Sequence, residues 1–195
     1  MAYKLSTTNS DCYEGTTILI NKLNIHDEVQ LQRDETLITT YIAAELIQQP
    51  LKTDFGFNDY RELHRKLFDK LYDWAGMPRT IGLSKTATTF AAPENITDLG
   101  ERIFLRLKRL NYFKGLPRQE FIAETADLYH NLNMLHPFRE GNGRTERVFL
   151  VQFVRNAGYD IDYSNLNSDL LMIGSIQAAS GVMDTLVKFF EDNIV

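Results

Sequence analysis

Apolar residues recur every three or four positions through most of this chain of 195 residues, and this spacing constrains the fold more than any other feature. It is the period of a helix with one buried face, so we expect an all-α protein. The segments that carry the pattern are 26–49, 58–74, 96–110, 117–135, 143–156, 170–178 and 183–190. Asn58 is the expected cap of the second segment. The segment from Gly143 to Asn156 is apolar on most sides, which predicts a central, buried helix.

A short stretch ahead of residue 96 lacks the helical pattern. Between Arg79 and Phe90 threonine is frequent and no apolar stripe is present. Because threonine favours extended backbone, we predict a short β-hairpin at about residues 80–91, called the flap below. No repeat, linker or low-complexity tract interrupts the chain, so we expect a single domain over residues 1–195.

Composition and charge narrow the classes of protein. The lone cysteine, Cys12, leaves no disulfide framework and no thiol cluster for zinc, which suits a reducing compartment and predicts a cytoplasmic protein. A net charge of -5 argues against direct binding to nucleic acid, and the basic stretch 102–118 is interpreted as the solvated side of a helix. No apolar run is long enough to span or enter a membrane.

The segment His136–Arg147 holds the parts that phosphate chemistry needs, in a turn between two predicted helices. The N-terminus of a helix carries unpaired N–H groups and the positive end of the helix dipole, so a glycine-rich turn there can bind a phosphate. Gly141 and Gly143 allow a close approach. Arg144 and Arg147 share one helix face about 5–6 Å apart, which suits successive phosphates of one polyphosphate.

Two further side chains in this segment suggest a reaction. Glu140 would repel phosphates unless a divalent cation lay between them, and Mg²⁺ prefers one or two carboxylates together with phosphate oxygens. His136 can be neutral near pH 7 and can take a proton from an attacking hydroxyl, a role worth about 10²–10⁴-fold in rate. These residues favour a phosphoryl or nucleotidyl transferase.

The same segment resembles, at every specified position, the signature of the Fic family, His-x-Phe-x-(Asp/Glu)-Gly-Asn-Gly-Arg-x-x-Arg. The resemblance extends to Asp73–Gly76 with Arg79, to Ser84–Ala91 and to Tyr13–Leu23. It implies a single Fic domain, with a helical lead-in at about residues 12–50, the flap at about 80–91 and a core at about 55–190.

The resemblance implies transfer of the AMP moiety of ATP to a Tyr, Thr or Ser hydroxyl of a target protein, with release of pyrophosphate. His136 would be the catalytic base, Glu140 would hold Mg²⁺ and Phe138 would anchor the loop. The remaining motif residues would bind ATP: Gly141, Asn142 and Gly143 as the anion hole, Arg144 near the β-phosphate and Arg147 at the γ-phosphate.

The family also suggests how a target is bound and what kind of target it is. Flap residues would pair with an extended segment of the target: Ser84, Lys85, Thr86, Ala87, Thr88 and Thr89. Family members modify subunits of type II topoisomerases or GTPases, and no residue here chooses between them. The expected location is the bacterial cytoplasm, with delivery into a host cell left open.

Many Fic proteins are restrained by a glutamate that pairs with the second motif arginine, here Arg147. That glutamate lies in a Ser/Thr-x-x-x-Glu-Gly/Asn helix, either in the chain itself or on a small partner antitoxin. Ser10 and Glu14 fit the spacing, but their neighbours are poor helix formers, so we favour a coincidence and expect a separate antitoxin.

Two alternatives to adenylyl transfer stay open. Doc-like kinases of the family bind ATP in reverse and transfer the γ-phosphate, but that branch departs from the Gly-Asn-Gly-Arg run that this chain keeps. An inactive nucleotide-binding interaction module is the other alternative. The remaining histidines, His26, His64 and His130, are assigned to caps and helix surfaces.

Overall fold

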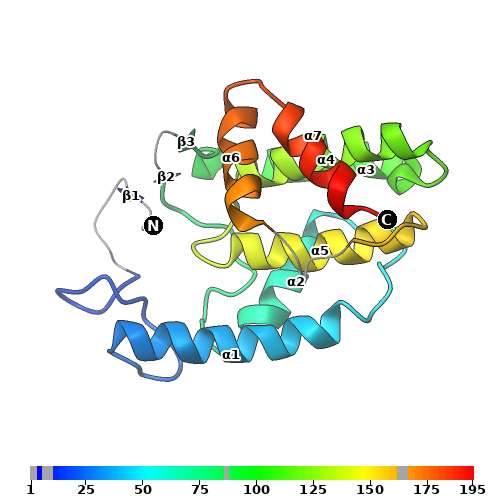
Figure 1. Cartoon of the computed structure of the whole chain (residues 1–195). Coiled ribbons are helices and arrows are strands. Elements are labelled where there is room, and N and C mark those ends of the chain that lie inside the picture. The colour runs from blue at the N-terminus through cyan, green and yellow to red at the C-terminus, as the bar shows by residue number, and fades with distance from the viewer. Residues whose placement is uncertain (1–3, 6–10, 86–87, 162–166) are drawn as a thin grey trace.

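The computed structural model describes residues 4–5, 11–85, 88–161 and 167–195, and its described part is built mainly of α-helices (Figure 1). The helices are α1 (Glu28–Leu46), α2 (Phe57–Phe68), α3 (Ile96–Arg109), α4 (Arg118–Leu135), α5 (Asn142–Asn156), α6 (Ser168–Ala179) and α7 (Asp184–Asn193). Single 3₁₀ turns at Pro93–Asn95 and Asn111–Phe113 flank α3. The expected all-α fold is confirmed. None of the described helices is both long and apolar enough to cross a membrane.

Helix α5 runs through the middle of the molecule, with α1 on one side and α6 and α7 on the other (Figure 1). Its residues Val148–Leu150, Phe153 and Val154 are almost fully buried. The Phe149 ring lies 5.2 Å from the ring of Phe55 and 5.6 Å from that of Tyr60. Such aromatic contacts each add about 0.5–1.5 kcal/mol beyond the area they bury. The predicted central, buried helix is therefore confirmed.

The flap is a small antiparallel sheet. Strands β2 (Leu83–Lys85) and β3 (Thr88–Thr89) form the predicted hairpin, and β1 (Lys4–Leu5) adds a third strand on the other edge of β2. Thr86 and Ala87 lie outside the described residues. Because β2 is paired on both sides, β3 carries an edge that no described strand covers.

The predicted limits of α2 were wrong at both ends. Gly56, not Asn58, is the N-cap, and its N–H donates to the Asp59 carboxylate at 2.9 Å. The helix ends at Phe68, where the N–H groups of Leu71 and Tyr72 both bond to the Phe68 carbonyl. Leu71 lies in this turn and is fully buried, so apolar residues at helical spacing continue after the helix has ended.

The lead-in before residue 50 is helical only from Glu28, where Asp27 caps α1 by accepting a hydrogen bond from the Gln30 N–H at 2.7 Å. Residues 12–27 form loops and turns, with a bridge between Cys12 and Leu19. The buried face of α1 also differs from the apolar stripe, because Val29 and Leu37 are 75% and 70% exposed. Leu31, Ile42 and Leu46 of that stripe are buried, and Thr39 is buried with them.

Candidate active site

The loop between α4 and α5 has a geometry that its own sequence imposes. It begins at His136, in the left-handed region at φ 42°, and ends at Gly141, at φ 81°. The side chain of Asn142 closes it, because its amide accepts a hydrogen bond from the Phe138 N–H and donates one to the Phe138 carbonyl, both at 2.8 Å. Asn142, which the family resemblance places in the anion hole, therefore also shapes the loop.

Gly141 and Gly143 differ in what they require of the fold. A Cβ at Gly141 would lie 2.2 Å from the Phe68 ring, so only glycine fits between the loop and α2. A Cβ at Gly143 would meet nothing within 4 Å. Close approach of backbone to core therefore explains Gly141, whereas Gly143 leaves open space at the start of α5.

His64 is a core residue, which corrects its assignment to a helix surface. It is fully buried, and its ring stacks on that of Phe138 at 3.8 Å between centroids. The Gly76 N–H donates to His64 Nδ1 at 2.9 Å, so Nε2 carries the proton and donates to the Glu140 carbonyl at 3.0 Å. Burial lowers the pKa of His64 to about 3, which keeps the ring neutral. Its place beside Leu63 and Leu67 on the apolar face of α2 was the signal in the sequence.

His136 is 6% exposed and oriented from two sides. Its Nδ1 lies 3.2 Å from the Asn133 carbonyl, which can only accept, so Nδ1 carries the proton and Nε2 is the nitrogen suited to act as a base. The Phe90 ring stacks on the imidazole at 3.8 Å and 11°. The last residues of the flap and the candidate base therefore touch.

Arg79 fastens the flap to this loop. Its buried guanidinium donates to the carbonyls of His136 at 2.8 Å, Ile81 at 2.7 Å and Ala91 at 2.6 Å, and burial lowers its pKa to about 10. The Ala91 N–H in turn donates to the Met134 carbonyl at 3.0 Å. Both ends of the flap are thus tied to the end of α4, where His136 stands.

Glu140, Arg144 and Arg147 converge on a cavity of about 790 Å³ between α1 and α5, called the α1–α5 cavity below. Glu140 Oε1 accepts the Gly141 N–H at 2.8 Å and lies 3.4 Å from Arg144 Nη2. Arg147 is exposed and forms no ion pair with any residue that the structure describes. The predicted clustering of a carboxylate and two arginines at the start of α5 is therefore present.

The same cavity has acidic and polar walls that the sequence did not reveal. Glu35 of α1 places Oε1 2.5 Å from Arg144 Nη2, and the Tyr72 hydroxyl donates to Glu35 Oε2. The Thr39 hydroxyl accepts from Arg144 Nη1 at 3.3 Å. The only signal was that Glu35 and Thr39 stand four positions apart, on the face that also carries Leu31 and Ile42.

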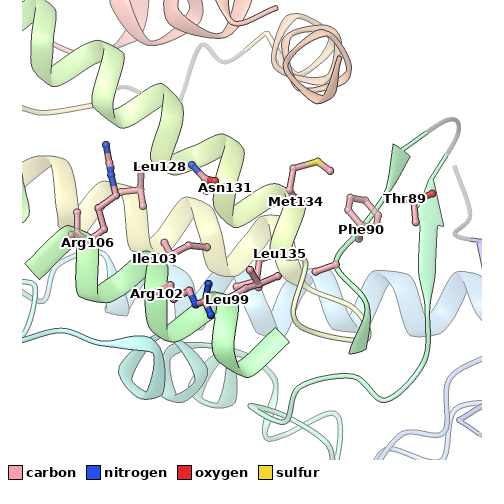
Figure 2. Close-up of a pocket in the computed structure, with 12 residues that line it drawn as sticks. Thr89, Phe90, Leu99, Arg102, Ile103, Arg106, Leu128, Asn131, Met134 and Leu135 are labelled. Carbon is pink, nitrogen blue, oxygen red and sulfur yellow. The ribbon is translucent and has the colours of Figure 1, made fainter. Parts of the chain in front are cut away.

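A second cavity, of about 480 Å³, begins beside the flap and is called the flap cavity (Figure 2). Thr89, Phe90 and Ala91 form one end, and α3 and α4 form its walls. Its lining is mostly apolar, including Leu99, Ile103, Leu107, Leu128 and Leu135, with Arg102 and Arg106 among them. Phe90 is shared between this cavity and the stack on His136.

The segment proposed for self-inhibition does not form a helix where the structure describes it. Ser10 lies outside the described residues, and Glu14 is exposed in a turn, where the Thr16 N–H bonds to the Tyr13 carbonyl. Glu14 forms no ion pair with Arg147 in this arrangement.

Fold and site together define a class of protein: a helical domain with a glycine-containing turn and two arginines at the start of its central helix and a histidine beside a β flap. The model of the Fic/DOC family matches residues 54–154, and the chain belongs to this family. A probable protein adenylyltransferase of Sinorhizobium fredii is 37% identical over 87% of this chain and 88% of that protein.

Two Bartonella proteins extend the comparison. The protein adenylyltransferase VbhT of Bartonella schoenbuchensis is 32% identical over 92% of this chain, which spans 37% of that longer protein. The crystal structure of the effector BepC from Bartonella tribocorum, with bound AMPPNP, matches with a TM-score of 0.88 at 27% identity, over 95% of this chain and 96% of that one. The relatives confirm the expected enzyme class, protein adenylyltransferase.

Proposed function

We propose that this chain uses ATP and Mg²⁺ to attach AMP to a hydroxyl side chain of a target protein. The observation that carries the proposal is the convergence of Glu140, Arg144 and Arg147 on the α1–α5 cavity at the N-terminus of α5. Three charged side chains and the helix dipole meet there, and this is the setting in which a polyphosphate is bound. The AMPPNP in the BepC structure supports a nucleotide as the ligand.

In this reaction the hydroxyl oxygen of the target attacks the α-phosphorus and a new oxygen–phosphorus bond forms. The bond between the α-phosphorus and the oxygen that bridges it to the β-phosphorus breaks, and pyrophosphate leaves with that oxygen and the bonding electron pair. His136 Nε2 takes the hydroxyl proton, since the contact of Nδ1 with the Asn133 carbonyl leaves that role to Nε2. Arg144 and Arg147 bind the leaving phosphates, and the N–H groups at the start of α5 stabilise the charge that develops.

The residues present fit a magnesium ion. Glu140 offers a carboxylate, 32% exposed, in the cavity that holds the two arginines, and Mg²⁺ favours one or two carboxylates with substrate phosphate oxygens. When bound, the ion neutralises charge on the phosphates. Glu140 would hold it, and His64 would keep the Glu140 backbone in place.

The target is proposed to bind along the flap. No described strand covers the outer edge of β3, and a target segment paired with it would run past Thr89 toward His136 and the flap cavity. An apolar side chain near the acceptor hydroxyl would enter that cavity. From the family resemblance we expect the target to be a type II topoisomerase subunit or a GTPase, and the acceptor to be a Tyr, Thr or Ser.

Restraint is proposed to come from a small antitoxin carrying the inhibitory glutamate, which would make the chain the toxin of a cytoplasmic pair. The exposed side chain of Arg147 supports a partner that reaches it from outside. A purified chain that is silent until Glu14 is replaced by glycine would contradict this proposal.

The decisive experiment compares ATP labelled at the α-phosphate with ATP labelled at the γ-phosphate in a bacterial lysate. We expect the α-label, and not the γ-label, to remain on a protein, and His136→Ala to abolish labelling while the melting temperature is kept. Retention of the γ-label would show a kinase instead. Failure of both labels in every lysate and in self-labelling would leave only an interaction module. His26→Ala, an exposed histidine far along the chain from the motif, is the matched control.

A further inference from the structure

Arg144 is held by more groups than phosphate binding requires. Its guanidinium lies between two carboxylates, at 2.5 Å from Glu35 and 3.4 Å from Glu140. Thr39 accepts a hydrogen bond from its other terminal nitrogen at 3.3 Å, and the Phe68 ring lies 4.7 Å from its Cζ. The ion pair with Glu35 is the shorter of the two.

Glu35 is itself fixed in position. Its side chain is 12% exposed, and the Tyr72 hydroxyl donates to its Oε2. Burial and the Glu35 charge raise the pKa of Tyr72, so this hydroxyl stays protonated and keeps donating. A carboxylate held in this way is a rigid partner for the guanidinium, not a mobile surface charge.

The arrangement matters because Arg144 and Glu140 stand four positions apart and already form a long ion pair of 3.4 Å, which would tighten without Glu35. A carboxylate bonded to a guanidinium has its charge already neutralised, so it is a weaker ligand for a divalent cation. Glu35 shares the same nitrogen, Arg144 Nη2, and has the shorter contact with it, 2.5 Å against 3.4 Å for Glu140.

We propose that Glu35 is a positioning residue for Arg144, which it keeps at the longer distance of 3.4 Å from Glu140 so that the Glu140 carboxylate is available for a magnesium-bound nucleotide. The inference rests on the proposed function, since it takes the α1–α5 cavity to be the nucleotide phosphate site. It assigns a role to α1, a helix outside the motif and outside the matched family segment.

Calorimetric titration with ADP, with and without Mg²⁺, tests this role in the full chain. For Glu35→Gln we expect the affinity for Mg-ADP to fall about tenfold, the size of effect seen when a partner of a metal ligand is removed. The affinity for ADP without metal should stay the same or rise, because a negative charge near the phosphates has been removed. Glu45→Gln, the same change at an exposed site on α1, should alter neither value.

The two titrations separate the alternatives. If Glu35→Gln weakens ADP binding equally with and without Mg²⁺, Glu35 has a purely structural role. If it strengthens ADP binding equally, Glu35 only repels or restrains the nucleotide. Either result overturns the proposal, and so does an unchanged affinity. Thr39→Val, which removes the weaker support of Arg144, should shift only the Mg-ADP affinity and by less than Glu35→Gln. If the unaltered chain bound no ADP at all, the proposed function would fail instead.

A kinetic readout complements binding. For adenylyl transfer by Glu35→Gln we expect the Mg²⁺ concentration at half-maximal rate to rise about tenfold, with kcat at saturating Mg²⁺ reduced by less than about threefold. A loss of kcat that Mg²⁺ cannot restore would contradict positioning. The melting temperature of each variant shows whether it is folded.

Discussion

Gly141→Ala tests whether close packing between the motif loop and α2 decides the conformation of the site. The added methyl group would lie 2.2 Å from one atom of the Phe68 ring and 2.4 Å from a second, and Phe68 is fully buried. The ring cannot move aside, because it stacks on His64 at 4.6 Å between centroids. The backbone at φ 81° is also unfavourable for any residue with a Cβ.

The magnitude follows from these two effects. A left-handed backbone costs a residue with a side chain about 1–2 kcal/mol. Overpacking a close-packed core costs about 1–3 kcal/mol. We therefore expect Gly141→Ala to lower the free energy of unfolding by about 2–5 kcal/mol, which for a domain of this length lowers Tm by about 4–20 °C.

Gly143→Ala is the matched control, since a Cβ there meets nothing within 4 Å and its φ is not positive. Alanine should leave the free energy of unfolding unchanged or raise it by up to about 1 kcal/mol, because it favours helix over glycine. Both variants are measured by urea unfolding without nucleotide, so that phosphate binding does not enter the comparison.

A double-mutant cycle isolates the contact with the ring. Phe68→Leu should relieve part of the Gly141→Ala penalty, with a coupling of about 1–3 kcal/mol, while the backbone cost stays. The reasoning is refuted if Gly141→Ala unfolds at the same urea concentration as the unaltered chain, or if Gly143→Ala is equally damaging.

Two further predictions concern pH and buried titratable groups. The pKa of His64 in the folded protein, about 3, is below its ordinary 6.5, so its contribution to stability is complete above pH 6.5 and is lost as pH falls toward 3, at about 1.4 kcal/mol per pH unit. Urea unfolding should therefore show the stability difference between the unaltered chain and His64→Gln shrinking by about 2 kcal/mol between pH 7 and pH 5. A stability difference that stays constant would contradict this. Burial raises the pKa of Glu146 above its ordinary 4.5, and its Oε1 has no hydrogen-bond partner among the described residues, so the contribution of Glu146 to stability is present below pH 4.5 and lost as pH rises. The stability that Glu146→Gln gains over the unaltered chain should therefore increase from pH 5 to pH 7.5. A gain that is the same at both pH values would show that Glu146 does not titrate in this way.

Much of the fold could be predicted because the evidence for it is local. The helical spacing of apolar residues located each of the described α-helices. The predicted C-terminal limit of α2 was wrong because a buried turn also needs apolar residues, and Leu71 in that turn happens to continue the helical spacing. The pattern reports burial, and burial does not need a helix.

The candidate site divides in the same way. By itself the sequence determined the residues of the motif from His136 to Arg147 and their place on a turn leading into a buried helix, because spacing along one chain segment decides what a short turn can bring together. Only the tertiary structure decided which distant groups hold that turn: His64 under Glu140, Arg79 behind His136, and Glu35 against Arg144. Those contacts join residues 57 to 109 positions apart, so they depend on how whole helices pack, and no local pattern records that.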